Sequence, residues 1–234
     1  MNDVKVLPDE DIEKLGIDDF YLLQKKIGFR FGVDAVILSD FVNKKGGRVL
    51  DLCSGSGIIP ILLIAKNKAD SFSALEIIEE LSDMINRSIK INKLENKANV
   101  ICGNLCEIEK YYEKESFDFI TVNPPYMKKN SGINSDDFNR NVARFEIACT
   151  IDDVARAAFY ALKPKGSVYL IHRAYRLVDI INSLVKYKLE PKRMKLVKSD
   201  NKKPPAMVLI EAVKYGNRQL NIEPDFIIEE QNDR

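Results

Sequence analysis

The residues best suited to chemistry are Asn123-Pro124-Pro125-Tyr126, which follow a run of six residues, 117–122, rich in β-branched and aromatic types. Such a run is typical of a buried strand. The two prolines stop it from continuing as helix or sheet, because they fix φ and remove two backbone donors. The motif offers the Asn123 amide oxygen, the Pro124 carbonyl and the Tyr126 ring. That set suits a planar group carrying an NH2.

An amine attached to a ring or a carbonyl is a poor nucleophile, because its lone pair is delocalised. Two acceptors that bind both of its hydrogens favour a pyramidal nitrogen and take up the charge that develops there, which is electrostatic catalysis by preorganised dipoles. The ring of Tyr126 would hold a flat target by stacking, at about 1–3 kcal/mol per base. The four residues alone are equally compatible with a rigid turn after a strand.

A glycine-containing loop, Cys53-Ser54-Gly55-Ser56-Gly57, follows a predicted strand over 48–52. The apolar run 58–65 after it predicts a buried helix with Pro60 in its first turn, where the missing N–H costs little. Glycines between a strand and a helix let a ligand approach the backbone closely. The loop is neither Gly-x-Gly-x-x-Gly nor a P-loop, which argues against a dinucleotide or triphosphate site.

Glu76 ends the second predicted strand, 71–75, and stands 25 residues after Asp51. An acidic side chain at this position can hold a ribose diol through two charge-assisted hydrogen bonds. The sequence therefore predicts a nucleoside-binding edge that also carries the amine-binding motif.

Strands and helices alternate along most of the chain, which indicates a parallel sheet with ligands at the carboxyl ends of its strands. Further strands are predicted at 100–102, 117–122, 167–171, 194–198 and 207–213, and helices at 32–42, 77–92, 152–162 and 176–187. Residues 1–20 are acidic and without clear periodicity, so we expect a peripheral segment, followed by two short strands around a turn within 20–31. The polar stretch 127–146 predicts a functional loop.

Composition limits the class of protein. With 234 residues, 45% hydrophobic and 30% charged, the chain suits one soluble α/β domain. The longest apolar run is too short for a bilayer and the amino terminus lacks the form of a signal peptide, so we expect a cytoplasmic protein with no membrane partner. The four cysteines form no Cys-x-x-Cys pair and His172 is the only histidine, which argues against a metal site.

Positive charge is concentrated although the net charge is only +1. Residues 186–203 hold eight basic residues against two acidic ones, a local balance of +6. We expect a nucleic-acid surface, and the alternative is a solvated face. The candidate phosphate contacts, which include basic residues of the polar loop, are Lys128, Lys129, Arg144, Lys192, Arg193, Lys202 and Lys203.

Asp51-Leu-Cys-Ser-Gly-Ser-Gly57, Glu76 and Asn123-Pro-Pro-Tyr126 together resemble the class I S-adenosylmethionine-dependent methyltransferases that methylate amines. The resemblance implies a Rossmann-like fold with a mostly parallel seven-stranded sheet and helices on both faces. It also implies that residues 1–46 are an extension packed on the core and that 47–234 form the methyltransferase domain. The cofactor would be S-adenosylmethionine, held at its methionine part by Asp51, Cys53, Gly55 and Gly57, at its ribose by Glu76 and near its adenine by Asn104.

Three further stretches, Gly28-Phe-Arg-Phe-Gly-Val-Asp-Ala-Val-Ile-Leu38, Val142-Ala-Arg-Phe-Glu146 and Leu162-Lys-Pro-Lys-Gly166, are similar to the bacterial tRNA adenine-N6 methyltransferases. These act on adenosine 37, in the anticodon loop of a valine tRNA. Phe145 stands where relatives commonly have His. The resemblance implies that Asn123 and Pro124 accept the amine hydrogens, and that tRNA is the partner.

Three alternatives stay open. A ribosomal-RNA guanine-N2 methyltransferase presents the same chemistry to another base. A release-factor glutamine-N5 methyltransferase has a similar core, but it carries a helical domain in front, for which about 50 residues leave little room. A non-catalytic, cofactor-dependent RNA-binding factor would not need Asn123 and Tyr126. A DNA adenine methyltransferase usually carries a target-recognition domain, and the chain is too short for one.

Overall fold

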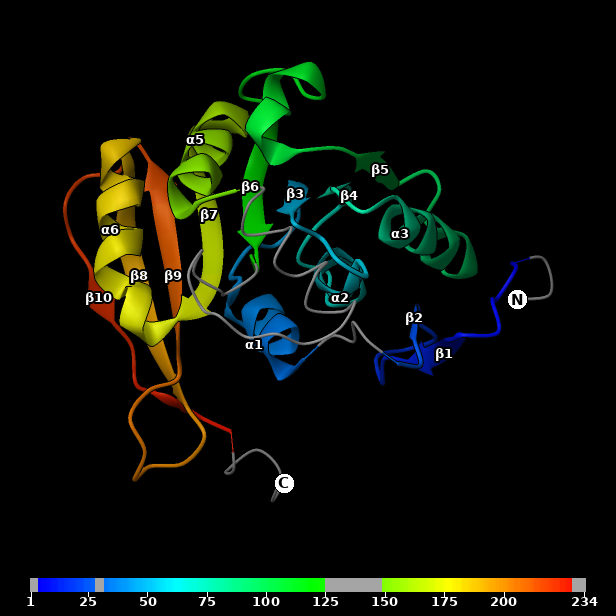
Figure 1. Cartoon of the computed structure of the whole chain (residues 1–234). Helices are drawn as coiled ribbons and strands as arrows, with labels where there is room; N and C mark the ends of the chain where they lie inside the picture. The colour runs from blue at the N-terminus through cyan, green and yellow to red at the C-terminus, as the bar shows by residue number, and fades with distance from the viewer. Residues whose placement is uncertain (1–3, 28–31, 125–148, 229–234) are drawn as a thin grey trace, which may run out of the picture.

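The computed structural model describes residues 4–27, 32–124 and 149–228 (Figure 1). The strands in these residues are β1 Glu10–Lys14, β2 Tyr21–Lys25, β3 Arg48–Leu52, β4 Ser71–Glu76, β5 Ala98–Cys102, β6 Phe117–Val122, β7 Leu162–Arg173, β8 Leu189–Lys198, β9 Met207–Lys214, β10 Asn221–Ile222 and β11 Phe226–Ile227. The helices are α1 Val33–Phe41, α2 Ile58–Ala65, α3 Glu79–Ile91, α5 Ile151–Ala161 and α6 Leu177–Lys186, with 3-10 turns η1 Leu105–Lys110 and η2 Ala174–Arg176.

In the described part of the chain, nine strands form the main sheet, in the order β10-β8-β9-β7-β6-β3-β4-β5, with β11 also paired to β8. The strands from β5 through β4, β3 and β6 to β7 run parallel, whereas β9 is antiparallel to both β7 and β8. This confirms the mostly parallel α/β sheet and corrects the expected strand number of seven. The additional strands β10 and β11 are two residues long, too short to leave a periodic signal in the sequence.

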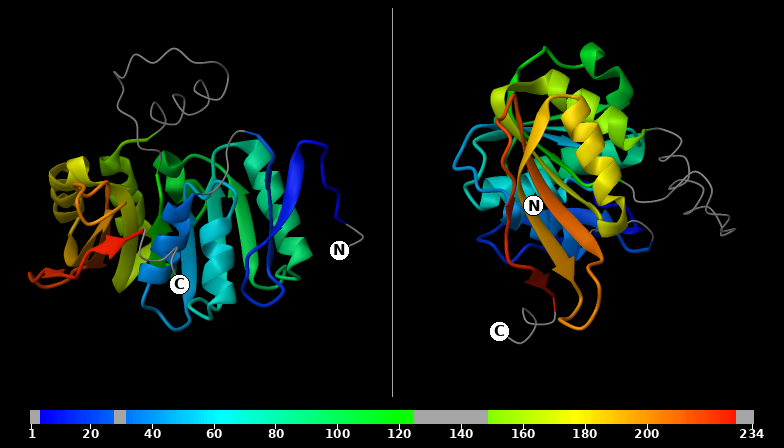
Figure 2. Two further views of the ribbon diagram at one scale, coloured as in Figure 1. Left: turned by 90° about the horizontal axis from the view of Figure 1, so that it is seen from below. Right: turned by 90° about the vertical axis from the view of Figure 1, so that its left-hand side faces the viewer.

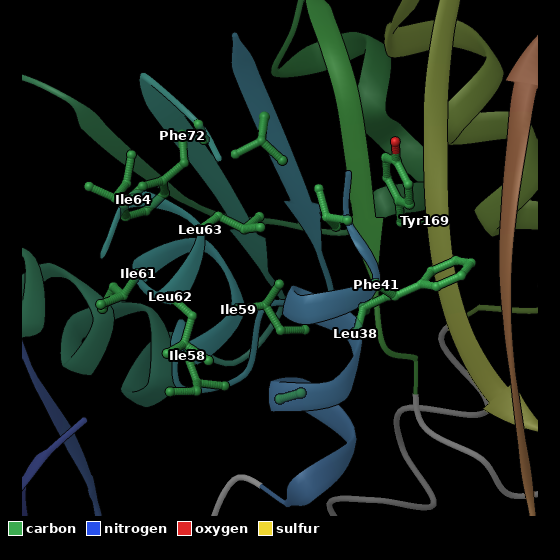
Figure 3. Packing of buried hydrophobic residues seen from close by; sticks show 14 of the residues in the cluster. Leu38, Phe41, Ile58, Ile59, Ile61, Leu62, Leu63, Ile64, Phe72 and Tyr169 are labelled. Carbon is green, nitrogen blue, oxygen red and sulfur yellow. The ribbon is translucent and has the colours of Figure 1, made fainter. Parts of the chain in front are cut away.

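Each face of the sheet buries its own hydrophobic cluster. One cluster joins α1 and α2 to Phe119 and Tyr169, and the other joins α5 and α6 to the opposite face. Figure 3 shows the apolar side chains of α2 in the cluster that also holds Phe41 and Tyr169. The rings of Phe41 and Tyr169 meet edge to face, with their centroids 6.2 Å apart. All residues of α2 are buried, which explains why it is apolar all round.

The amino-terminal region differs from the expectation. Residues 10–14 form a strand, β1, which pairs antiparallel with β2. Within 20–31, β2 confirms one of the two predicted strands, but its hairpin partner is β1, earlier in the chain. Residues 28–31, where the second strand is expected, lie outside the described residues. In Figures 1 and 2 this hairpin packs beside α3, at the end of the molecule opposite α6. The division into 1–46 and 47–234 stays a prediction.

Candidate active site

Strand register brings the predicted site residues to one edge of the sheet. The last pairs of β3 join Leu52 to β4 on one side and to β6 on the other. The residues that come next at this edge, Cys53, Glu76 and Asn123, therefore lie side by side at the carboxyl ends of three neighbouring strands. Ligands bind at this edge in open α/β sheets.

Asp51 lies beneath this edge and is fully buried. Its carboxylate accepts hydrogen bonds from Ser54 Oγ at 2.5 Å and from Thr121 Oγ1 at 2.6 Å. Burial raises the pKa of Asp51 to about 7, and the nearby Glu76 charge adds to that rise, against the two hydrogen bonds. The group is therefore poised to gain or lose a proton near neutral pH.

The loop from Cys53 to Gly57 turns through left-handed backbone. Cys53, Gly55 and Gly57 have φ values of 56°, 59° and 79°. A side chain in this region costs about 1–2 kcal/mol, so Cys53 holds a backbone conformation that glycine adopts more easily. Gly57 is constrained a second time, because a Cβ there would lie 3.0 Å from the side chain of Ile85 in α3.

Glu76 joins the tip of β4 to this loop. Its Oε2 accepts from the backbone N–H of Gly55 at 2.7 Å, and its Oε1 accepts from that of Ile78 at 3.0 Å. The side chain is buried, and burial raises its pKa. The backbone N–H of Ile77 also favours the charged carboxylate, and a carboxylate has about four lone-pair sites, so at least one acceptor position is left for the hydroxyl groups of a ligand.

Ser56 provides an independent test of whether this loop suits a polar ligand. It is fully buried, and its Oγ has no hydrogen-bond partner among the described residues. Buried polar groups are normally satisfied, so a hydroxyl of this kind indicates a ligand or water that supplies the partner. Together with Asp51 and Glu76, the loop fits a molecule that has a nucleoside and a charged end.

Asn104 lies beyond β5, two residues after the strand ends. Its Oδ1 accepts from the N–H of Cys106 at 2.9 Å and so begins η1. The preceding Gly103 has the Tyr111 ring against it, and a Cβ there would approach the ring to 2.6 Å. Sequence reasoning missed this contact, for which Gly103 itself was the signal. The proposed role of Asn104 near adenine stays a prediction.

Only part of the Asn-Pro-Pro-Tyr motif falls in the described chain. Asn123 is half-buried and Pro124 is buried, directly after β6. Pro125 and Tyr126 lie outside the described residues, as do Lys128, Lys129 and Arg144. Asn123 follows Thr121 by two residues, and Thr121 donates to Asp51. The amine-binding and cofactor-binding candidates are thus joined through one hydrogen-bonded pair of strands.

The basic stretch 186–203 does not form one patch. Five of its eight basic residues form ion pairs: Lys186 with Asp152, Arg193 with Glu211 and Glu223, Lys195 with Glu223, Lys198 with Asp225, and Lys203 with Asp200. Most of these carboxylates come from other parts of the chain. The charge of +6 counted along the sequence is therefore partly neutralised in the fold.

The candidate phosphate contacts in the described chain lie at opposite edges of the sheet. Lys202 and Lys203 lie in the turn between β8 and β9, and β9 begins opposite the end of β7, at the edge that carries Asn123. Lys192 instead donates to the carbonyl of Asn217, beyond the other end of β9. Arg193 borders a cavity of about 770 Å³ between α1 and β8.

His172 is 4% exposed, and burial lowers its pKa to about 4. It is therefore neutral at physiological pH and away from solvent, which fits a structural role.

A hydrogen bond with Cys149 and burial raise the pKa of the Cys53 thiol, so Cys53 is not a reactive thiolate. No cluster of His, Cys, Asp and Glu suited to a metal ion occurs in the described ranges.

The family model for the methyltransferase small domain matches residues 32–181, a stretch that runs from α1 to α6 and includes every cofactor-site candidate. The chain belongs to this family. This confirms the methyltransferase class expected from the motifs.

Curated relatives agree with the narrower resemblance. The chain is 26% identical over 187 residues to the tRNA1(Val) (adenine(37)-N6)-methyltransferase of Photobacterium profundum, covering 79% of this chain and 77% of that protein. It is 25% identical over 214 residues to the enzyme of the same name from Flavobacterium psychrophilum, covering 89% and 88%. A third, from Parabacteroides distasonis, is 26% identical, covering 82% and 80%.

Solved structures support the Rossmann-like fold. A predicted O-methyltransferase from Agrobacterium tumefaciens has a TM-score of 0.67 at 20% identity, covering 83% of this chain and 86% of that one. P. horikoshii TYW2, solved in complex with MeSAdo, has a TM-score of 0.61 at 11% identity, covering 91% of this chain and 74% of that one.

Within the described residues, none of the helices has the length and apolarity needed to cross a bilayer.

Proposed function

We propose that this protein transfers a methyl group from S-adenosylmethionine to the N6 amine of an adenine in a tRNA anticodon loop, at position 37 of a valine tRNA. The observation that carries the proposal is the edge where Cys53, Glu76 and Asn123 lie side by side. The relatives that bear this activity in their names match most of the chain.

S-adenosylmethionine supplies an electrophilic methyl group on a sulfonium. The loop and Asp51 hold its methionine part, Glu76 accepts from the ribose hydroxyls and Asn104 lies toward the adenine. Two observations support this use of the cofactor: the buried, unpartnered hydroxyl of Ser56 among the described residues, and the MeSAdo complex of a protein with the same fold.

Asn123 and the Pro124 carbonyl accept the two hydrogens of the target amine, Pro125 fixes the geometry and Tyr126 stacks on the base. The acceptors localise the lone pair on nitrogen and stabilise the charge that develops there. A loop base is cheap to extrude because little stacking is broken. A protein with these roles works on cytoplasmic tRNA and needs neither metal nor membrane.

The substrate class is tested with labelled S-adenosylmethionine in separate reactions with unmodified tRNA, ribosomal RNA and release factor. Label in tRNA as N6-methyladenosine is the expected result. Label in N2-methylguanosine or in glutamine would mean that the protein has one of the rival activities. No label in any of the three reactions would contradict catalysis.

Affinity for the cofactor product should depend on pH through Asp51, whose pKa is raised to about 7 by burial. The charged carboxylate favours a ligand ammonium, so binding of S-adenosylhomocysteine should strengthen as pH rises toward 7 and level off above it. Below pH 7 the loss approaches about tenfold per pH unit at most. Calorimetric titrations from pH 5.5 to 8.5 measure this, and Asp51→Asn should flatten the profile; an unchanged slope in that variant would assign it to another group.

Affinity for tRNA should fall steeply with salt, since phosphate contacts release counterions. Among the described candidates, Lys202 and Lys203 should contribute most, because both are exposed and lie at the edge of Asn123, although the ion pair of Lys203 with Asp200 reduces the share of Lys203. Replacing both with Ala should reduce the slope of log affinity against log salt by roughly 0.7–0.9 for each phosphate that is no longer neutralised. Lys192 and Arg193 should contribute less, because their side chains are already engaged.

A matched control for this measurement is Lys188→Ala. Lys188 is exposed and belongs to the same basic stretch, but it lies before β8, at the opposite edge. Filter binding between about 50 and 200 mM salt should leave its slope at the wild-type value. Equal slopes in all three proteins would mean that the turn between β8 and β9 is a solvated face.

A further inference from the structure

Gln24, in β2, is a buried group that the proposed site leaves without a role. Its side chain is 1% exposed, and neither its Oε1 nor its Nε2 has a hydrogen-bond partner among the described residues. Each buried polar group left without a partner costs about 1–3 kcal/mol. A native protein keeps such a group where something else supplies the partner.

The hairpin directs Gln24 toward the cofactor edge. The backbone N–H of Leu23 donates to Ser88 Oγ in the second half of α3, at 3.0 Å, and Lys25 forms an ion pair with Glu80 in the first turn. β2 therefore runs along α3 toward its amino end. That end begins three residues after Glu76, the tip of β4.

Alternation along β2 determines which face Gln24 occupies. Leu23 packs with Leu81 of α3 in a small outer cluster, whereas Leu22 belongs to the core cluster that contains the isoleucines of α2 and Ile85. Successive side chains of a strand point to opposite faces, so Gln24 shares the face of Leu22. Gln24 follows Leu22 by two residues and therefore lies nearer the carboxyl edge of the sheet, where the glycine loop ends and α2 begins.

The glycine loop contributes a second buried polar group, the Ser56 hydroxyl, which also has no hydrogen-bond partner among the described residues. The next residue, Gly57, lies against Ile85 of α3, so the loop and this helix are in contact here. The other buried side chains without partners in the described chain are Ser73 and Tyr112, and Ser73 lies close enough to lower the pKa of Tyr112. For Gln24 and Ser56, the described residues offer no comparable polar neighbour.

We propose that Gln24 and Ser56 form a polar subsite for a zwitterionic amino-acid group, the methionine end of the cofactor. An amide matches a zwitterion, because Oε1 accepts from the ammonium while Nε2 donates to the carboxylate. Hydrogen bonds to charged groups are stronger than neutral ones, which suits a small, fully buried contact. The proposal rests on the use of S-adenosylmethionine proposed above.

The subsite gives the amino-terminal hairpin a function. The hairpin precedes residues 32–181, the part matched by the family model. It is nevertheless fixed firmly, since buried Glu10 accepts from Arg87 of α3 and Asn92 bonds both the N–H and the carbonyl of Tyr21. Such anchoring holds Gln24 in place before the ligand arrives, which reduces the entropy lost on binding.

The test compares two ligands by calorimetry. S-adenosylhomocysteine has the amino-acid end, whereas 5′-methylthioadenosine keeps the nucleoside and thioether without it. Gln24→Leu should weaken binding of S-adenosylhomocysteine by roughly 10- to 100-fold, as expected when hydrogen bonds to charged groups are removed, and leave 5′-methylthioadenosine within about twofold. The variant should keep the thermal stability of the free protein, because it removes two unpartnered polar atoms.

Tyr112→Phe is the matched control, since it removes another buried polar atom, one that lies beside Ser73 in β4, and both affinities should stay at wild-type values. Equal losses for the two ligands in Gln24→Leu, or no loss for either, would overturn the subsite while the proposed function stands. If the wild-type protein failed to bind S-adenosylhomocysteine, the proposed function and the subsite would both be overturned.

Discussion

Asn123→Ala should lower the rate of methyl transfer by at least about a hundredfold to a thousandfold, while the affinity for S-adenosylhomocysteine stays within about twofold of wild type. Loss of one preorganised group that stabilises developing charge typically costs about 3–4 kcal/mol of transition-state stabilisation. Asn123 follows β6 directly, whereas the cofactor candidates lie on the loops after β3 and β4. Truncation at Asn123 therefore removes an amine acceptor without disturbing the cofactor loop.

Single-turnover rates with saturating cofactor and tRNA measure the effect, and calorimetry measures the affinity. Asn123→Asp is the matched variant, because a carboxylate keeps acceptor oxygens at the same position. It should retain more activity than Asn123→Ala. Wild-type turnover in the alanine variant would exclude Asn123 from the chemistry.

Glu76→Ala should have the opposite signature, with affinity for S-adenosylhomocysteine reduced by roughly a hundredfold or more. Two charge-assisted hydrogen bonds to a ribose diol would be removed, each worth about 1.5–3 kcal/mol. The substitution also leaves the N–H groups of Gly55 and Ile78 without their acceptor. The free protein should therefore be less stable as well, although removing a buried carboxylate with a raised pKa offsets part of the loss.

Calorimetry, thermal unfolding and rates at increasing cofactor concentration separate these contributions. Turnover in Glu76→Ala should recover in part as cofactor approaches saturation, which Asn123→Ala should not do. Glu76→Gln keeps one acceptor oxygen and should be intermediate in both affinity and stability. A loss of stability with unchanged affinity would mean that Glu76 only braces the loop.

Much of the fold and of the site could be predicted because the relevant signals are local. Asp51, Glu76 and Asn123 each follow or end an apolar run, and parallel strands bring such ends to one edge whatever lies between them. The helices α1, α2 and α3 differ from their predicted ranges by no more than one or two residues at each end. Apolar periodicity and glycine positions were sufficient there.

What could not be predicted depends on partners distant in the sequence. Residues 10–14, Glu-Asp-Ile-Glu-Lys, carry no strand pattern, and they pair with β2 while buried Glu10 binds Arg87. Charge counted along 186–203 overstated the basic surface, because acidic residues from other elements neutralise it. Gln24 is an ordinary polar residue in sequence, and only its burial without a partner in the described chain marks it.

The most direct test of the central claim is methylation of an unmodified valine tRNA transcript by the wild-type protein, followed by mass spectrometry of the anticodon-loop fragment and of its nucleosides. The account predicts one added methyl group on that fragment, recovered as N6-methyladenosine, and none when the adenine at position 37 is replaced by guanine. Methylation elsewhere in the tRNA, or recovery of N2-methylguanosine, would contradict the account.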